Sequence, residues 1–510
     1  MVLKTQNHWN QVGFGPHHGI ALPLSALRSK NSCGIGEFYD LIPLIDWCKS
    51  LQFDCIQLLP LADTGDDPSP YNQLSSCALD PIYLSLKELP GADPKTFAQF
   101  NVLTNLPRVA ISTVKQLKLQ WLNRYFETVF SSVSQSQSYL HFIDTHSWAT
   151  PYAVFKSLKT QYNGASWEYW PKEAKEYHQA IKLAQKETVQ FHLFLQYLCY
   201  TQLKKVREYA SAQHFFLKGD IPILLSPDSV DVWANPSLFN LELTAGAPPD
   251  YYNKLGQNWG FPLFNWEAMY EADFSWWKQR LLAASHLFHL YRIDHVVGLF
   301  RIWGIPKGKK AKEGHFIPEN KSLWPIQGQK ILEMMLKASP LLPIAEDLGT
   351  IPKEVYSILK ALGICGTKVI RWERYWEKDK QYIPYALYEP FSMTTVSTHD
   401  ADTLSGWWKN YPDEARIFAQ FKGWTYQDKL TRDQLFSILR DSHQTPSYFH
   451  INLLQEYLAL FPELVNPNPE EERINVPGVN LRANWTYRFK PFVEEISQHA
   501  ELTKIMQQFL

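Results

Sequence analysis

The segment Leu290-Tyr-Arg-Ile-Asp-His-Val-Val-Gly298 predicts a short β-strand with charged residues inside it. Its apolar and β-branched residues favour a strand, and the alternation of side chains places Arg292 and Asp294 on the same face. Burying a carboxylate beside a guanidinium costs desolvation free energy, so the presence of such a pair indicates a structural or a catalytic role. The segment alone leaves two interpretations open: a structural ion pair, or a catalytic group at the C-terminal end of a strand.

Strand-like and helical segments alternate over much of the chain, which predicts an α/β fold and, more specifically, a (β/α)₈ TIM barrel. The strand-like runs are Gly19–Leu24, Phe53–Pro60, Gly219–Leu225, Leu290–Val297, Leu341–Ala345, Lys368–Trp372 and Met393–Ser397. Pro343 argues against one of these runs, because proline removes a ladder donor.

Domain organisation is predicted as one catalytic barrel over residues 1–510. Residues 86–210 have helical periodicity, with Val114, Leu117 and Trp121 at positions that share a face, and they predict a mainly helical insertion between two strands. The tail from about residue 407 to residue 510 is expected to be mostly helical.

Composition is that of an ordinary globular protein. The chain has 510 residues, 20% charged and 45% hydrophobic, with a formal net charge of −1. These values indicate neither disorder nor a nucleic-acid partner. There is no apolar run long enough for a membrane span and no signal peptide, and the six cysteines are scattered, so we expect a cytoplasmic protein. Aromatic residues make up 15% of the chain, which suits a packed core or stacking on sugars. No pattern predicts an oligomeric state.

Three predicted strand ends carry acidic residues, namely Asp294, Glu346 and Asp400. The C-terminal ends of barrel strands meet at one mouth, so these carboxylates are expected to converge. Chemistry at a glycosidic bond requires one ionised carboxylate and one protonated carboxyl group. Arg292 is expected to keep Asp294 ionised, and crowding by its acidic neighbours is expected to keep Glu346 protonated. Each carboxylate alone remains open to a structural interpretation, whereas the set favours catalysis.

Other chemistries have weaker signals in the sequence. His295 and His399 lie beside the carboxylates, but neither H-x-x-x-H nor H-E-x-x-H occurs there, so no metal is predicted. The chain also has no G-x-S-x-G elbow and no glycine-rich nucleotide motif. We therefore expect an enzyme without a cofactor.

The motifs around these carboxylates resemble those of the amylomaltase family, which are 4-α-glucanotransferases of glycoside hydrolase family 77 in the α-amylase superclan. The similarity spans most of the chain and combines Arg-Ile-Asp294-His, Ala-Glu346-Asp-Leu-Gly and Thr-His-Asp400 with further motifs. These are Ser69-Pro-Tyr71, Gly219-Asp-Ile-Pro222, Asp228-Ser-Val-Asp-Val-Trp233, Gly246-Ala-Pro-Pro-Asp250-Tyr251, Gly256-Gln-Asn-Trp259-Gly, Asn475-Val-Pro-Gly478 and Asn484-Trp485.

The resemblance implies a retaining double displacement in a barrel. It assigns Asp294 as the nucleophile, Glu346 as the general acid and then base, and Asp400 as the third carboxylate, which binds sugar hydroxyls and stabilises the transition state. Substrate contacts are implied for Arg292, His399, Tyr71, Asp220, Tyr251, Gln257, Trp259 and Asp347. Core packing remains an alternative for Tyr71 and Trp259, and a loop hydrogen bond for Gln257.

The link Asn240–Ala245 is shorter than the hairpin of many family members. It resembles the branch that includes plant cytosolic and some bacterial enzymes acting between maltose and larger glucans. The implied partners are maltooligosaccharides, maltose, glycogen or other α-1,4-glucans. Two other functions stay open: an amylase-like hydrolase and a catalytically silent glucan-binding protein.

Overall fold

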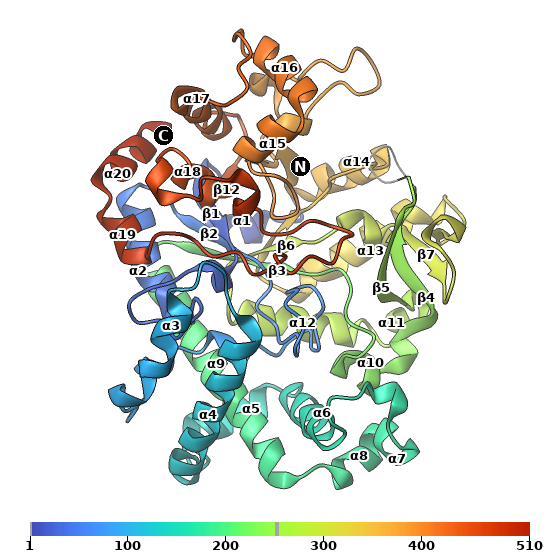
Figure 1. Ribbon diagram of the computed structural model, residues 1–510. Helices are drawn as coiled ribbons and strands as arrows, with labels where there is room; N and C mark the ends of the chain where they lie inside the picture. The colour runs from blue at the N-terminus through green and yellow to red at the C-terminus, as the bar shows by residue number, and fades with distance from the viewer. Residues whose placement is uncertain (1–2, 250–253) are drawn as a thin grey trace.

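The computed structural model describes residues 3–249 and 254–510, and its centre is a parallel sheet of eight strands (Figure 1). In spatial order the strands are β10 (Gly366–Val369), β11 (Ser392–Thr395), β12 (Phe449–Leu453), β1 (His17–Leu22), β2 (Cys55–Leu58), β3 (Phe216–Ile221), β6 (Leu290–Ile293) and β9 (Leu342–Ala345). The two edge strands meet where Ala345 N–H donates to the Cys365 carbonyl at 2.7 Å, just before β10. The sheet is thereby nearly closed, and the predicted (β/α)₈ barrel is confirmed.

Strand boundaries differ from the sequence prediction in places that matter for the site. β6 ends at Ile293, so Asp294 follows the strand instead of lying within it. β12 is a barrel strand inside the tail that was expected to be mostly helical, and that expectation was wrong for these residues. Its sequence, Phe-His-Ile-Asn-Leu, is short and apolar and lies between helices, so local periodicity does not distinguish it from them.

Pro343 lies inside β9 and is compatible with the barrel. Along a parallel strand the N–H groups alternate between the two neighbours, so the nitrogen of Pro343 faces the same side as that of Ala345. That side faces β10, where the ladder consists of the short contact with Cys365. The missing donor therefore falls at the weakly paired seam of the barrel.

Helices cover the outside of the barrel. Residues between β2 and β3 form the helical region, which comprises α3 (Asn101–Thr104), α4 (Ile111–Val133), α5 (Gln137–Thr145), α6 (Ala149–Gln161), α7 (Lys172–Lys175), α8 (Tyr177–Leu183) and α9 (Lys186–Ala212). The others are α1 (Gln6–Val12), α2 (Leu41–Ser50), α10 (Val230–Ala234), α11 (Trp266–Glu271), α12 (Ser275–Ser285), α13 (Leu323–Ala338), α14 (Lys353–Leu362), α15 (Leu404–Asn410), α16 (Pro412–Phe421), α17 (Arg432–His443), α18 (Leu454–Leu458), α19 (Val493–Gln498) and α20 (Ala500–Met506). The division into one barrel domain with an inserted helical part stays a prediction.

A second, antiparallel sheet stands beside the barrel and was not expected from the sequence. Its order is β5 (Gln257–Phe264), β4 (Phe239–Ala247), β7 (Ile302–Pro306) and β8 (His315–Ile317), and it lies at the right of Figure 1. The short link at residues 240–245 is part of β4. Its alternating polar and apolar residues agree with a strand that has one face covered.

One hydrophobic cluster joins the barrel to its surroundings. It includes Ile20 and Ile344 of the barrel, Phe194 of α9 and Leu454 of α18, all nearly or fully buried. The six cysteines are free and buried. Within residues 3–249 and 254–510, no helix is both long enough and apolar enough to span a membrane.

Candidate active site

Arg292 lies at the centre of an acidic cluster at the C-terminal end of the barrel. It is paired in register with Asp220 of the neighbouring strand β3, and its Nη1 contacts the two oxygens of Asp220 at 2.9 and 3.0 Å. The same nitrogen lies 2.8 Å from Asp294 Oδ1, and Nη2 lies 3.5 Å from Glu346 Oε2. Burial works against the charged guanidinium, but Asp220 and Asp294 outweigh it and raise the pKa of Arg292 well above its usual value.

Both carboxylate oxygens of Asp294 have a donor partner. Arg292 contacts Oδ1, and the backbone N–H of Ile223, just beyond β3, donates to Oδ2 at 3.2 Å. Its side chain is 19% exposed, so a ligand can reach it from the barrel mouth. These contacts fix the orientation of the Asp294 carboxylate beside Arg292.

Glu346 follows β9 and is aimed at Arg292 by backbone donors. His295 N–H donates to Oε2 at 2.8 Å, and Leu348 N–H donates to Oε1 at 3.0 Å. His295 adopts the left-handed conformation, with φ of 43°, which is uncommon outside glycine. The sharp turn after β6 therefore contributes a backbone donor to the carboxyl group that follows β9.

Asp400 forms a second acidic group, beyond β11. Asn475 Nδ2 donates to its Oδ1 at 2.7 Å, and its Oδ2 lies 3.4 Å from His399 Nε2. The Asp400 side chain is 46% exposed, and partial desolvation at the mouth would raise its pKa, but His399 and the Asn475 hydrogen bond lower it to about 2. Burial would lower the pKa of His399, yet Asp400 raises it above the usual value, so the two groups form an ion pair.

Tyr71 connects the two acidic groups. Its hydroxyl donates to Asp220 Oδ2 at 2.8 Å and lies 3.0 Å from His399 Nε2. The Tyr71 and His399 rings are stacked, with centroids 5.3 Å apart, and the Trp485 ring lies beside both, at 5.7 Å from Tyr71 and 6.0 Å from His399. Side chains from five barrel strands (β2, β3, β6, β9 and β11) or the loops after them therefore form one continuous network around the mouth.

The remaining predicted residues lie around this network or apart from it. Asp347 is apart: its side chain is buried and accepts from Thr367 N–H at 2.6 Å, against the start of β10. Burial raises its pKa to about 6. Gln257 and Trp259 share a hydrogen bond at the start of β5, and the Trp259 ring meets His295 edge-on at 5.1 Å. Tyr251 lies outside the described residues.

Comparison with known proteins agrees with this geometry. The profile of a protein family described as 4-alpha-glucanotransferase matches residues 22–494. The chain belongs to this family. A 4-alpha-glucanotransferase of Chlamydia pneumoniae is 44% identical, covering 100% of this chain and 99% of the relative. That of Chlamydia caviae is 45% identical and covers 96% of this chain and 94% of the relative.

The fold of this 4-alpha-glucanotransferase family member is also found in a solved structure. Amylomaltase from Streptococcus agalactiae in complex with acarbose superimposes with a TM-score of 0.82 and 22% sequence identity. The match covers 97% of this chain and 98% of the amylomaltase. At this identity the likeness establishes the fold, while the roles of individual residues depend on the geometry of this chain.

Sequence reasoning missed two side chains of this glucanotransferase site. Asn475 binds Asp400, and Trp485 contacts the rings of Tyr71 and His399. Both residues belong to motifs that the resemblance includes. No spacing or charge pattern in the sequence, however, links the segment that contains Asn475 and Trp485, here called the C-terminal segment, to β11. In the part of the chain that the structure describes, no cluster of three or more His, Cys, Asp or Glu side chains could hold a metal ion.

Proposed function

We propose that this family member transfers α-1,4-glucan segments between maltooligosaccharides by a retaining double displacement. Asp294 is the nucleophile, Glu346 the general acid and base, and Asp400 the carboxylate that binds sugar hydroxyls. The observation that carries the proposal is the shared contact of Arg292 with Asp294 and Glu346, which follow neighbouring strands β6 and β9. Two carboxyl groups on one guanidinium lie close enough to act on the same glycosidic bond.

In the first step an Asp294 oxygen attacks the anomeric carbon, and the bond from that carbon to the glycosidic oxygen breaks. Glu346 gives its proton to the departing oxygen, which leaves as the 4-hydroxyl of the shortened glucan. Three N–H groups already donate to Glu346: those of His295, Leu348 and Arg292. A carboxyl group has about four lone-pair positions, so one remains for the transferred proton.

In the second step the 4-hydroxyl of an acceptor glucan enters. Glu346, now ionised, takes the hydroxyl proton while the acceptor oxygen attacks the anomeric carbon and releases Asp294. Two inversions give net retention of the α configuration. Asp400 has its pKa lowered to about 2 by His399 and Asn475 against partial desolvation, so it stays ionised and accepts hydrogen bonds from sugar hydroxyls throughout.

The substrates proposed for this reaction are maltose, maltooligosaccharides and glycogen-like glucans. Their support is the family, together with aromatic side chains at the mouth such as Tyr71, Trp259 and Trp485, which offer flat surfaces to sugar rings. We place the reaction in the cytoplasm, in agreement with six free, buried cysteines.

Incubation with maltotriose, followed by chromatography of the products, tests the proposal. Glucose together with a ladder of longer oligosaccharides is the expected result. A steady rise in reducing ends without longer products would identify a hydrolase and overturn the proposal of transfer. Unchanged maltotriose, together with glucan binding measured by calorimetry, would identify a binding protein.

A further inference from the structure

The loop that carries Tyr71 is closed at its base. We call residues 62–79 the Tyr71 loop and residues 61–63 with 78–80 its neck. Ala62 and Leu79 form an antiparallel bridge, Asp63 N–H donates to Ala78 at 3.0 Å, and Asp80 N–H donates to Leu61 at 2.9 Å. Because both ends of the loop are joined in this way, the position of Tyr71 depends on how the neck is held.

Two buried carboxylates lie in the neck, and the helical region supplies their partners. Lys115 of α4 lies 3.2 Å from Asp63 Oδ1 and 2.7 Å from Asp80 Oδ2. Lys156 Nζ and the Tyr152 hydroxyl, both of α6, donate to Asp63 Oδ2 at 2.7 Å each. The Asp63 side chain is only 1% exposed, so these contacts replace its hydration.

The charges of this cluster balance. Lys115 and Lys156 neutralise Asp63 and Asp80, and burial of Asp63 is outweighed by the two lysines, which lower its pKa well below the usual value. Loss of one partner would leave a buried charge without compensation, which is far more costly than loss of a surface ion pair. The cluster therefore fixes the neck strongly.

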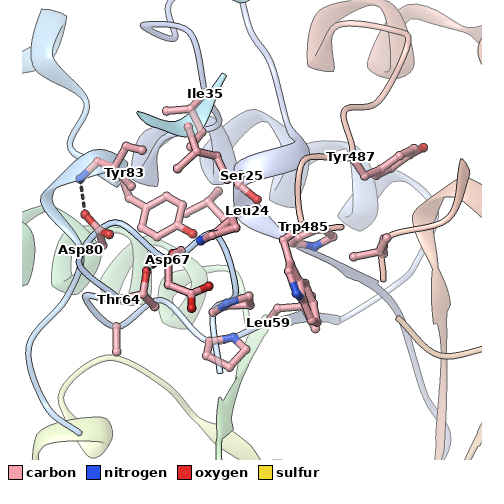
Figure 2. A pocket seen from close by; sticks show the side chains of 18 residues that line it. Leu24, Ser25, Ile35, Leu59, Thr64, Asp67, Asp80, Tyr83, Trp485 and Tyr487 are labelled. Atoms are coloured by element: carbon pink, nitrogen blue, oxygen red, sulfur yellow. Dashed lines mark hydrogen bonds between the residues drawn. The ribbon is translucent and has the colours of Figure 1, made fainter. Parts of the chain in front are cut away.

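The N-terminal half of the Tyr71 loop faces a cleft. The cleft is lined by Thr64, Asp67 and Pro70 of the loop, by Asp80 of the neck, and by Ile474 and Trp485 (Figure 2). In this half of the loop Lys115 also donates to the Gly65 carbonyl, so the helical region restrains the loop beyond the neck.

The C-terminal half of the loop is anchored separately: Ser76 donates to Asp231, and Val230 N–H donates to the Leu74 carbonyl. Tyr71 lies between the two halves, with its hydroxyl on Asp220 and beside His399.

We propose that Lys115, Tyr152 and Lys156 are positioning residues, through which the helical region holds the Tyr71 hydroxyl on Asp220 and His399. The inference rests on the proposed function, because the placement of Tyr71 affects catalysis only if a sugar binds in this network. The helical region thus contributes to the reaction without touching the substrate.

The test measures kcat and KM for maltotriose disproportionation in Tyr152→Phe and Lys156→Met, each also combined with Tyr71→Phe. Tyr152→Phe removes one hydrogen bond and leaves the charges and the ring in place, so it keeps the test valid if Lys156→Met unfolds. Lys422→Met is the matched control, because Lys422 is similarly buried and pairs with Asp441 far from the loop. Thermal unfolding of every variant reports on stability.

The expected result is a fall in kcat/KM of about tenfold for Lys156→Met and several-fold for Tyr152→Phe. In the Tyr71→Phe background each change should cost less than about twofold, because the group through which it acts is already lost. Lys422→Met should keep wild-type kcat and KM. If kcat/KM fell equally in the wild-type and Tyr71→Phe backgrounds, or did not fall at all, the inference would be overturned. An inactive wild-type protein would instead refute the proposed function.

Discussion

At the scale of single residues, Arg292 decides the chemistry of the mouth. One guanidinium contacts Asp220, Asp294 and Glu346, so the three carboxylates that surround it share one positive charge. Asp220 is the most enclosed of them, with a fully buried side chain, whereas Asp294 and Glu346 keep some exposure. The enclosed carboxylate holds Arg292 in place, and the two exposed ones remain free to meet a substrate.

Replacement of the nucleophile separates catalysis from folding. We expect Asp294→Asn to lower kcat for maltotriose by about a thousandfold or more, because no covalent intermediate can form. Arg292 keeps Asp220 as its partner, so thermal stability and glucan binding should change little. Asp54→Asn, at the other end of the barrel, is the control and should retain activity. A crystal structure should place the Asp294 and Glu346 carboxyl groups about 5–5.5 Å apart; about 9 Å would contradict a retaining mechanism.

The ion pair of His399 and Asp400 makes the free energy of unfolding depend on pH in a defined direction. The pKa of His399 is raised above its usual 6.5 and that of Asp400 is lowered from 3.8 to about 2. The ion pair therefore makes its full contribution to the free energy of unfolding between pH 3.8 and pH 6.5. It is lost as pH rises through the folded pKa of His399 or falls through about 2.

NMR titration of the His399 ring measures this prediction. We expect a midpoint above 6.5 in the wild type and a lower midpoint in Asp400→Asn, because the ion pair that stabilises the imidazolium is gone. His18, whose pKa burial lowers to about 4, serves as an internal reference and should not move between the two proteins. An unchanged His399 midpoint in Asp400→Asn would show that the carboxylate is not its charge partner.

At the scale of elements, sequence pattern located what is local and missed what is assembled from distant segments. β6 and β9 were predictable because an apolar run ends in a carboxylate at each. β12 was not, since its five residues gain strand character only from pairing with β1 and β11. In the antiparallel sheet β4 pairs with β7 across the segment that contains α11, α12 and β6, and Asn475 reaches Asp400 through tertiary packing alone.

The C-terminal segment can be tested through that one amide. Asn475→Ala removes the donor to Asp400 Oδ1, so the carboxylate gains freedom and its pKa should rise from about 2. We expect kcat/KM for maltotriose to fall about tenfold, with little change in thermal stability. Asn105→Ala, which removes an amide that bonds only within its own helix end, should leave kcat/KM unchanged. Equal activities of the two variants would place Asp400 outside the control of this segment.

At the scale of the whole molecule, the two ends of the barrel carry different titratable groups. Carboxylates gather at the C-terminal end, whereas His18 of β1, His450 of β12 and His443 of α17 meet at the N-terminal end. The Nδ1 atoms of His18 and His443 lie 2.8 Å apart, and His443 Nε2 lies 2.7 Å from the Tyr457 hydroxyl. Burial, followed by repulsion from the neighbouring histidines, lowers the pKa values of His443 and His450 well below 6.5.

This cluster should make the fold sensitive to acid. Below pH 6.5 these histidines are protonated in the unfolded chain but stay neutral in the folded protein. Each of them therefore lowers the free energy of unfolding by up to about 1.4 kcal/mol for every unit by which the pH falls. For His18 the effect operates from 6.5 down to its folded pKa of about 4. Asp40 and Glu456 act in the opposite sense, because burial raises the pKa of each to about 7. The change of the wild-type free energy of unfolding with pH is therefore the sum of both effects.

The difference between two proteins isolates the histidines. Urea unfolding of the wild type and of His18→Gln at pH 7, 6 and 5 should give a shallower loss of stability in the variant, because glutamine cannot bind the proton. His178→Gln, at an exposed position, should follow the wild type at every pH. Since the buried carboxyl groups are the same in all three proteins, their contribution cancels in the comparison. A His18→Gln slope equal to that of the wild type would mean that the cluster takes up protons in the folded state.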